Sequence, residues 1–259
     1  MSFPYRLEHF RAVDSTQRVV REWLDAGTPE VCVAVTGYQT AGRGRQGRDW
    51  VAPPGAALLL SVGFRPQNLA AGHAWRLAAI VALAMRDAAE AVAGLQDGTL
   101  WLKWPNDLVV DAPDGGIRKV CGVLGESVAS GDLVESAVVG IGVNTDWQMR
   151  DFPWAIARTM TSLRELAGKR PIDNGVMLEA FIDRLEPRYE ALRSGTFDAG
   201  GWSAAQRTTG RTVVVEVGGG SVTGKGAGVN PESGALFVQP DLGKLETIDS
   251  GEVIRCRVL

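Results

Sequence analysis

The sequence predicts an α+β protein with a large first domain and a small all-β second domain. Its 259 residues, of which 45% are hydrophobic and 22% charged, suffice for one large and one small domain or for two modest ones. Helical and extended patterns alternate as far as residue 209. From Gly210 onward only short strand-like runs and glycine-rich turns remain, which is typical of a small β-barrel. The predicted domains are therefore 1–209 and 210–259.

The first domain opens with a predicted strand, helix and strand. Leu7–Val13 is expected to be extended, and the polar triplet Asp14-Ser15-Thr16 can cap the helix that follows. Gly27 and Pro29 end that helix. Val31–Tyr38 alternates and is rich in β-branched residues, which predicts the second strand.

Buried strands and helices follow along the chain. Ala57–Phe64 is an apolar run short enough for a buried strand, whereas the alanine-rich segment Ala70–Gly94 is long enough for a helix. Further strands are predicted over 100–104, 118–129 and 133–143, and further helices over 162–167 and 173–193. Pro187 should kink or split the last helix. In the second domain, strands are predicted over 212–217, 222–229, 235–239, 245–248 and 252–258.

Composition excludes several classes of protein. A net charge of -3 provides no general attraction for nucleic acid. Three scattered cysteines and two histidines argue against a disulfide framework, a zinc site or a Ser-His-Asp triad. The most apolar stretch, Leu77–Met85, is far shorter than the roughly 20 residues that cross a bilayer, and residues 1–10 lack the apolar core of a signal peptide. We therefore expect a cytoplasmic protein that does not bind membranes.

Residues 39–50 form the first segment that suggests chemistry. Its glycines let the backbone approach a ligand, and its arginines offer planar groups suited to phosphate or carboxylate. A solvated basic loop or an arginine-glycine segment for nucleic acid has the same composition. The position between two apolar strands favours a loop that grips a ligand. The residues concerned are Gly42, Arg43, Gly44, Arg45, Gly47 and Arg48.

Three later segments place polar groups or glycines on strands. Residues 103–107, Lys-Trp-Pro-Asn-Asp, end a strand and leave Asn and Asp oxygens that suit Mg²⁺, although a plain turn is the simpler explanation of this segment alone. Lys119 lies among apolar residues and needs an anionic partner, either a bound ligand or an acidic side chain. The two glycines of Val139–Asn144 allow close approach to the backbone or mark a β-bulge.

Taken together and in order, these segments resemble one family. GRGRQGRDW, KWPND, KVCGVLGE and GIGVN are similar to the motif series of biotin–protein ligases, and the resemblance covers Asp14 to Asn144. It implies a mixed-sheet catalytic domain similar to class II aminoacyl-tRNA synthetases, followed by an SH3-like barrel. It also implies a ligase that makes biotinyl-5′-AMP from biotin and Mg-ATP and transfers biotin to a lysine of a biotin carboxyl carrier domain. Members of the family often form homodimers.

The resemblance also implies a role for individual residues. Catalysis is assigned to Lys119, Arg45 and Asp107, with Asp107 also the Mg²⁺ ligand and a candidate proton acceptor. The residues expected to bind biotin are Ser15, Thr16, Gln17, Gln39, Arg43, Gly44, Arg45 and Lys119. Those expected to bind the nucleotide are Arg45, Arg48, Trp50, Asn106 and Asn144. Two positions depart from the family pattern, because Gln17 stands where asparagine is usual and Cys121 replaces a smaller residue.

Three rival functions fit the sequence less well than biotin–protein ligase activity. Lipoate or octanoate ligases share the catalytic fold but carry a run of glycines with a nearby histidine, which residues 42–47 lack. A biotin-responsive DNA-binding repressor needs an N-terminal winged helix-turn-helix, and Ser15 already lies in the expected substrate site. An inactive ligand-binding relative is at odds with the presence of Lys119, Asp107 and Arg45. We therefore expect a ligase that does not bind DNA.

Overall fold

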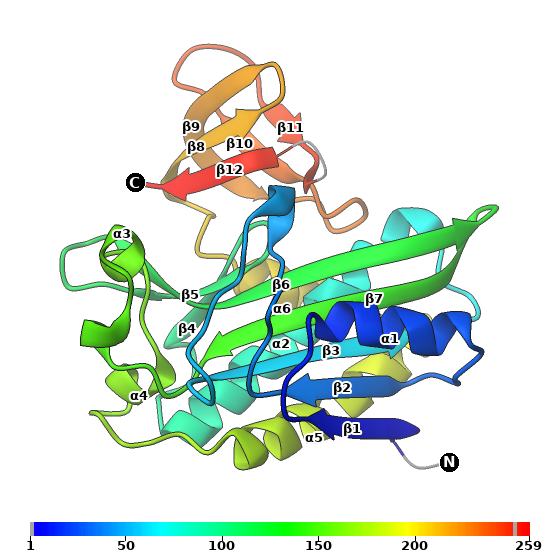
Figure 1. Cartoon of the computed structure of the whole chain (residues 1–259). Helices are drawn as coiled ribbons and strands as arrows, with labels where there is room; N and C mark the ends of the chain where they lie inside the picture. The colour runs from blue at the N-terminus through cyan, green and yellow to red at the C-terminus, as the bar shows by residue number, and fades with distance from the viewer. Residues whose placement is uncertain (1–2, 251–252) are drawn as a thin grey trace.

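The computed structural model describes residues 3–250 and 253–259, which form a seven-stranded and a five-stranded sheet. Figure 1 shows the five-stranded sheet standing to one side of the larger sheet and its helices. Helices and strands are mixed in the first part of the chain, and the elements bounded in the described residues after 212 are strands, as the α+β prediction requires. No helix in the described part of the chain is long and apolar enough to cross a membrane.

The larger sheet has the strand order β1-β2-β3-β7-β6-β5-β4. It is a mixed sheet, because β1 pairs parallel with β2, whereas every other pair of neighbouring strands in the sheet is antiparallel. Its strands are β1 (Arg6–Phe10), β2 (Cys32–Thr36), β3 (Ala57–Phe64), β4 (Leu100–Lys103), β5 (Asp107–Asp111), β6 (Ile117–Ser130) and β7 (Leu133–Asn144). Strand β5 was not predicted, and the predicted limits of β3 are confirmed.

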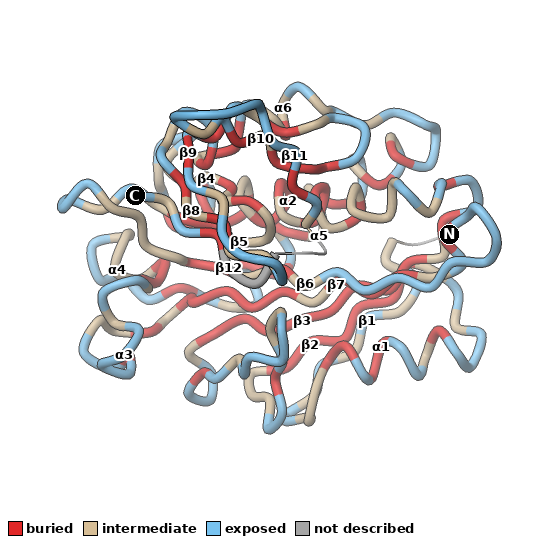
Figure 2. The backbone as a smooth tube through the Cα atoms, turned by 90° about the horizontal axis from the view of Figure 1, so that it is seen from above, coloured by how far each residue is buried: buried red, intermediate tan, exposed pale blue. Residues whose placement is uncertain are grey.

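Helices cover both faces of this sheet. Helix α1 (Thr16–Asp25) packs on β2, β3 and β7 from one side, whereas α2 (Trp75–Ala93) and α5 (Asn174–Arg193) lie together on the other side (Figure 2). The remaining helices are the short α3 (Trp154–Ala157), α4 (Leu163–Leu166) and α6 (Ala199–Ala204). The apolar side chains of α2 and α5 join those of β3 in one large core, and α1 completes a smaller one.

Two helix predictions need correction in detail. Helix α5 continues through Pro187, so of the two expected effects of the proline a split does not occur, and a kink stays a prediction. Pro187 lies late in the helix, after the turns formed by residues 180–186. The buried side chains of Phe181 and Leu185 hold those turns in the core, so the helix continues past the proline. Helix α2 begins at Trp75 rather than at residue 70, because Ala71–His73 forms a separate 3₁₀ turn.

The C-terminal residues form the five-stranded antiparallel sheet, in the order β11-β10-β9-β8-β12. Its strands are β8 (Thr212–Val217), β9 (Gly220–Val229), β10 (Leu236–Gln239), β11 (Glu246–Ile248) and β12 (Val253–Val258). They confirm the predicted strands, except that Glu252 lies outside the described residues. The two sheets touch where the buried Trp104 indole donates a hydrogen bond of 2.9 Å to the Gly234 carbonyl.

Candidate active site

A strip of small residues, which we call the floor of the trough, lies on the α1 face of the seven-stranded sheet. The register places Ala34 beside Ser61, and Ser61 beside Gly140, in one row across β2, β3 and β7. In the next row Gly142 of β7 pairs with Gly122 of β6. Large side chains fill the same strands on the opposite face, so this strip of small residues belongs to the α1 side.

The glycines of this floor are required by the side chains that rest on it. A Cβ atom at Gly140 would lie 2.9 Å from the Gln17 side chain, which reaches across from α1. A Cβ atom at Gly122 would lie 2.9 Å from the Trp50 ring, and one at Gly142 would overlap that ring. The register of β7 is regular through residues 139–144, so the predicted close approach to the backbone, and not a β-bulge, explains these glycines.

Polar groups from α1 and from the segment after β2 form one wall of the trough. The Thr16 backbone N–H donates to Gln39 Oε1 at 2.8 Å, and the Thr16 hydroxyl donates to the same oxygen at 3.1 Å. The Gln17 amide donates to the Leu124 carbonyl at 3.0 Å. Ser15 is the N-cap residue of α1, as predicted, but its side chain makes no capping hydrogen bond. Thr16 and Gln39, both assigned to biotin, are therefore in direct contact, and Ser15 and Gln17 flank Thr16 in the chain.

The loop of residues 42–50 closes over this end of the sheet. Its base is fixed because the Trp50 N–H donates to the Gly42 carbonyl at 2.9 Å, and its tip because the Gly44 N–H donates to the Arg48 carbonyl at 2.7 Å. The Arg43 and Arg48 side chains are exposed. Arg45 instead extends to the C-terminal sheet, where it donates to the Ser250 carbonyl. Burial lowers the pKa of the Arg45 guanidinium, and Asp107 nearby opposes that effect.

Two lysines and a carboxylate form the charged centre of the site. Asp107 Oδ1 lies 2.6 Å from Lys119 Nζ, and Asp107 Oδ2 lies 3.2 Å from Lys103 Nζ. Burial raises the pKa of Asp107, but the two ammonium groups outweigh burial and bring it down to about 2. The Lys119 ammonium also lies 5.2 Å from the centre of the Trp50 ring. The anionic partner expected for Lys119 is therefore an acidic side chain from another motif.

Lys103 is a site residue that the sequence analysis missed. It begins the Lys-Trp-Pro-Asn-Asp segment, of which only the Asn and Asp oxygens were considered as ligands. Lys103 and Asp107 stand four residues apart around Pro105 and face each other across the β4–β5 turn. This spacing is the sequence signal from which their ion pair could have been predicted.

Both asparagines assigned to the nucleotide bind the backbone. Asn106 Nδ2 donates to the Val123 carbonyl at 2.9 Å, beside the Val123 N–H that donates to the Asn106 carbonyl. Asn144 is 2% exposed, and its Nδ2 donates to the Thr161 carbonyl at 3.0 Å. These bonds tie the turn before β5 to the interior of β6 and the end of β7 to residue 161, and nucleotide contacts of the two residues stay predictions.

Metal ligands are few around this centre. The described residues contain no group of three or more His, Cys, Asp and Glu side chains placed to hold a metal ion. Both oxygens of Asp107 already face ammonium groups. Mg²⁺ usually takes one or two protein carboxylates and completes its shell with phosphates and water. The site fits a magnesium ion that arrives with a nucleotide better than a resident one.

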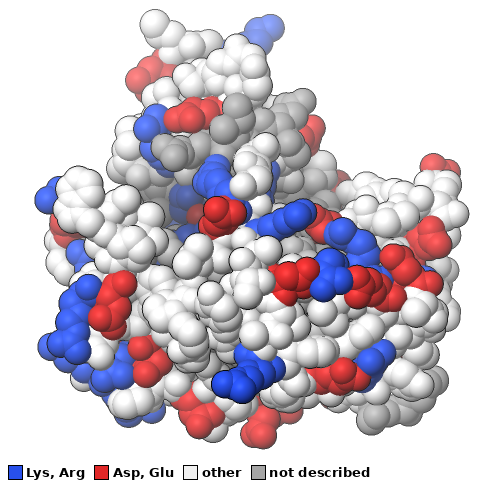
Figure 3. Space-filling model, viewed as in Figure 1, with Lys and Arg blue, Asp and Glu red and all other residues white. Residues whose placement is uncertain are grey.

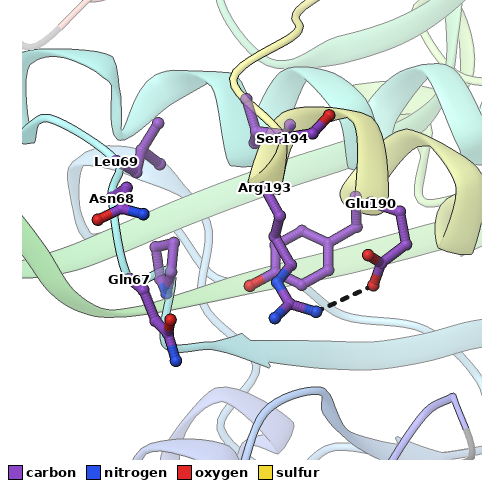
Figure 4. A pocket seen from close by; sticks show the side chains of 9 residues that line it. Gln67, Asn68, Leu69, Glu190, Arg193 and Ser194 are labelled. Atoms are coloured by element: carbon purple, nitrogen blue, oxygen red, sulfur yellow. Dashed lines mark hydrogen bonds and ion pairs between the residues drawn. The ribbon is translucent and has the colours of Figure 1, made fainter.

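Two cavities flank the sheet. One of about 350 Å³ lies between α2, the edge of β6 and the turn 103–107, and Arg45, Lys103 and Asp107 lie at its polar end. The other, of about 270 Å³, lies between residues 66–69 and the end of α5 (Figure 4). There the Arg193 guanidinium points toward Glu190 at 3.1 Å, so its charged groups are mutually paired. Only the first cavity adjoins the candidate site.

Charged side chains on the face that carries the site are of both signs. Figure 3 shows lysine and arginine side chains near the boundary between the two sheets, interspersed with acidic ones. This arrangement suits a small anionic ligand held by a few local cations better than a long polyanion.

Comparison with known proteins identifies the family. The model of the biotin/lipoate A/B protein ligase family matches residues 9–144, which include the trough, the loop and the charged centre. The chain belongs to this family. A bifunctional ligase/repressor of Bacillus spizizenii is 30% identical over 233 residues, which cover 89% of this chain and 68% of that relative. A biotin–[acetyl-CoA-carboxylase] ligase of Paracoccus denitrificans is 33% identical over 223 residues, 83% of this chain and 86% of the relative.

Solved structures of family members agree with the fold. The biotin protein ligase of Aquifex aeolicus in complex with biotin and ATP superposes with a TM-score of 0.78 at 28% sequence identity. The match covers 98% of this chain and 100% of the Aquifex chain. The likeness therefore extends over both sheets of the present family member.

Proposed function

We propose that this family member is an ATP-dependent biotin–protein ligase. It makes biotinyl-5′-AMP from biotin and ATP and transfers biotin to a lysine of a biotin carboxyl carrier domain. The observation that carries the proposal is the convergence of Thr16, Gln39, Trp50 and Lys119 around one glycine-floored trough. The names of the Paracoccus and Aquifex relatives support biotin as the substrate.

The trough suits a flat ligand with a polar head and an anionic tail. Its glycines already let the Trp50 ring and the Gln17 side chain lie close to the backbone of the sheet, and a ligand ring can approach beside them in the same way. The Gln39 amide, whose oxygen is held by Thr16, offers a directed N–H donor at one end, which the cyclic urea of biotin can use and a fatty acyl chain cannot. Lys119 offers a cation toward the other end. These features favour biotin over lipoate or octanoate.

In the first step, the biotin carboxylate attacks the α-phosphorus of ATP and pyrophosphate leaves. This step brings two anions together, and we propose that Lys119, Lys103 and Arg45 offset their repulsion and stabilise the charge that develops. Trp50 Nε1 is buried and has no hydrogen-bond partner among the described residues, so it is free to donate to the adenylate. Mg²⁺ bound with the nucleotide would neutralise its phosphates.

In the second step, the carrier lysine amine attacks the acyl carbon of biotinyl-5′-AMP, and AMP leaves as the amide forms. With a pKa of about 2, Asp107 is a weak proton acceptor at neutral pH. We propose that Asp107 positions Lys119 and Lys103 instead. The neighbouring cations disfavour a charged amine, so the incoming lysine gives up its proton to solvent more readily.

The finer features of the fold follow the same proposal. The mixed sheet would correspond to the catalytic domain of class II aminoacyl-tRNA synthetases, and the C-terminal sheet to an SH3-like barrel. The domain boundary near residue 210 is supported by the change from helices to strands alone.

Exchange of labelled pyrophosphate into ATP tests the first step. We expect exchange that depends on biotin, and transfer of biotin when a biotin carboxyl carrier domain is added. Exchange that depends on lipoate or octanoate but not on biotin would contradict the proposal and favour the other branch of the family.

A further inference from the structure

A buried serine lies in the middle of the trough floor. Ser61 is the hydroxyl residue of β3, a strand that is otherwise apolar, and its exposed fraction is 0%. Its row neighbours are Ala34 and Gly140. A buried hydroxyl needs a hydrogen-bond partner, and Ser61 Oγ finds one in the Thr16 hydroxyl at 2.7 Å. Ser61 is thus tied to the polar wall of the trough.

The donors and acceptors of this wall have one consistent order. The Thr16 backbone N–H can only donate, so the atom 2.8 Å from it must be the carbonyl oxygen of the Gln39 amide. The Thr16 hydroxyl lies 3.1 Å from that oxygen and donates to it. Its own oxygen is then left to accept, and Ser61 is the donor. The three side chains form a directed chain from Ser61 through Thr16 to Gln39.

This chain determines what Gln39 presents to a ligand. Its carbonyl oxygen accepts two hydrogen bonds from Thr16, which leaves the amide N–H₂ facing the other way. A Cβ atom at Gly42 would lie 2.9 Å from Gln39 Nε2, so the glycine at the base of the loop makes room for that nitrogen in this orientation. Gln39 is therefore held as a donor toward a ligand acceptor.

We propose that Ser61 is a positioning residue that sets the specificity of the site for a head group with a carbonyl acceptor, the cyclic urea of biotin. The proposal rests on the proposed biotin ligase function. Ser61 acts through Thr16 and Gln39 and does not touch the reacting carboxylate. A site built around such directed hydrogen bonds rejects a ligand without the acceptor far more strongly than an apolar pocket does. Octanoate is such a ligand.

The Ser61→Ala variant tests this role. Because one buried hydrogen bond in the chain is lost, the biotin KM in pyrophosphate exchange should rise about tenfold, with kcat and the ATP KM unchanged. Any exchange that octanoate supports should not change. Ser61→Cys keeps the packing but is a weaker donor, so its biotin KM should be intermediate. A structural loosening would instead raise the ATP KM as well.

A double-mutant cycle with Gln39→Ala sharpens the result. If Ser61 acts through Gln39, the Ser61→Ala change should add little to the biotin KM once Gln39 is alanine. Tyr189→Phe is the matched control, since it removes a buried hydroxyl that donates to Glu30 on the opposite face of the sheet. It should lower the melting temperature and leave the biotin KM unchanged.

The outcomes separate this inference from the proposed function. A wild-type biotin KM in both Ser61 variants, equal rises in the biotin and ATP KM values, or additive effects in the cycle would each overturn the role of Ser61. Absence of biotin-dependent exchange in the wild-type protein would overturn the biotin ligase proposal itself.

Discussion

The two faces of the seven-stranded sheet are built from the same strands but differ in side-chain size. Toward α2 and α5, β3 presents Leu58, Leu60, Val62 and Phe64, which are at most 2% exposed. Toward α1, the rows across β2, β3, β7 and β6 contain glycine, alanine and serine. Since strand residues alternate between faces, one face can hold the large core while the other keeps a strip of small residues for a ligand.

The largest expected effect is a loss of catalytic rate on substitution of Lys119, which lies at the candidate site. Lys119→Ala removes a cation that would face the reacting carboxylate and phosphate, so biotinyl-5′-AMP formation should slow by roughly a hundredfold. Pyrophosphate exchange measures the rate, and circular dichroism checks folding. The exposed Lys244→Ala variant in the C-terminal sheet is the control. Wild-type exchange in Lys119→Ala would remove Lys119 from the catalytic residues.

Substitutions at two neighbouring residues of β7 should distinguish the roles of the two faces. Gly142→Ala places a methyl group against the Trp50 ring, and we expect the biotin and ATP KM values to rise about tenfold with little loss of stability. Ile141→Ala, one residue away on the core face, should cost about 3 kcal/mol of unfolding free energy and leave both KM values unchanged. Urea unfolding and steady-state kinetics measure the two effects. The same response to both substitutions would contradict the division between faces.

Acid should lower the stability of the protein by protonating Asp107. Its pKa is lowered from 3.8 to about 2, so the ionised carboxylate stabilises the fold above pH 4, and this contribution disappears as pH falls through 2. The wild-type melting temperature should therefore fall more steeply between pH 4 and pH 2 than that of Asp107→Asn. The exposed Asp183→Asn variant should follow the wild type. Parallel curves for wild type and Asp107→Asn would show that the two lysines do not hold this carboxylate.

The smallest expected effect concerns the residue that departs from the family pattern. Gln17→Asn is one methylene shorter and cannot keep the 3.0 Å bond to the Leu124 carbonyl, so the biotin KM should rise about threefold with kcat unchanged. The exposed Gln67→Asn variant, on the other side of the sheet, is the control. A biotin KM below that of the wild type would mean that Gln17 narrows the trough and does not complete it.

The elements that the sequence predicted well have strong local patterns. β3 is a nearly continuous apolar run, and α1 begins at the polar triplet that ends in Thr16. Both elements can therefore be predicted from the residues of their own segments. β5 was missed because it begins two residues after Pro105 and has only five residues. Its pairing with β4 and β6 is a tertiary effect that local propensity does not contain.

The candidate site was predictable in its motifs but not in its connections. The motif series placed Thr16, Gln39 and Lys119 in the site, and the structure brings the first two into contact. Ser61 carries no local signal, because a single serine in an apolar run has no period. Its importance appears only when the register aligns it with Gly140 on the neighbouring strand. The pairing of Lys119 with Asp107 likewise depends on a turn between β4 and β5.

The hydrogen bond between Trp104 and Gly234 limits how freely the C-terminal sheet can be exchanged between family members. Trp104 is 2% exposed and lies three residues before Asp107, so its indole N–H must find an acceptor wherever the first part of the chain is kept. Here a backbone carbonyl near residue 234 supplies it, and Thr208 accepts the Trp104 backbone N–H at 3.0 Å. A hybrid joined near residue 210 keeps Thr208 but must bring its own carbonyl to this position. Hybrids that fail to do so should lose the geometry of the Lys103–Asp107 turn even when both halves fold.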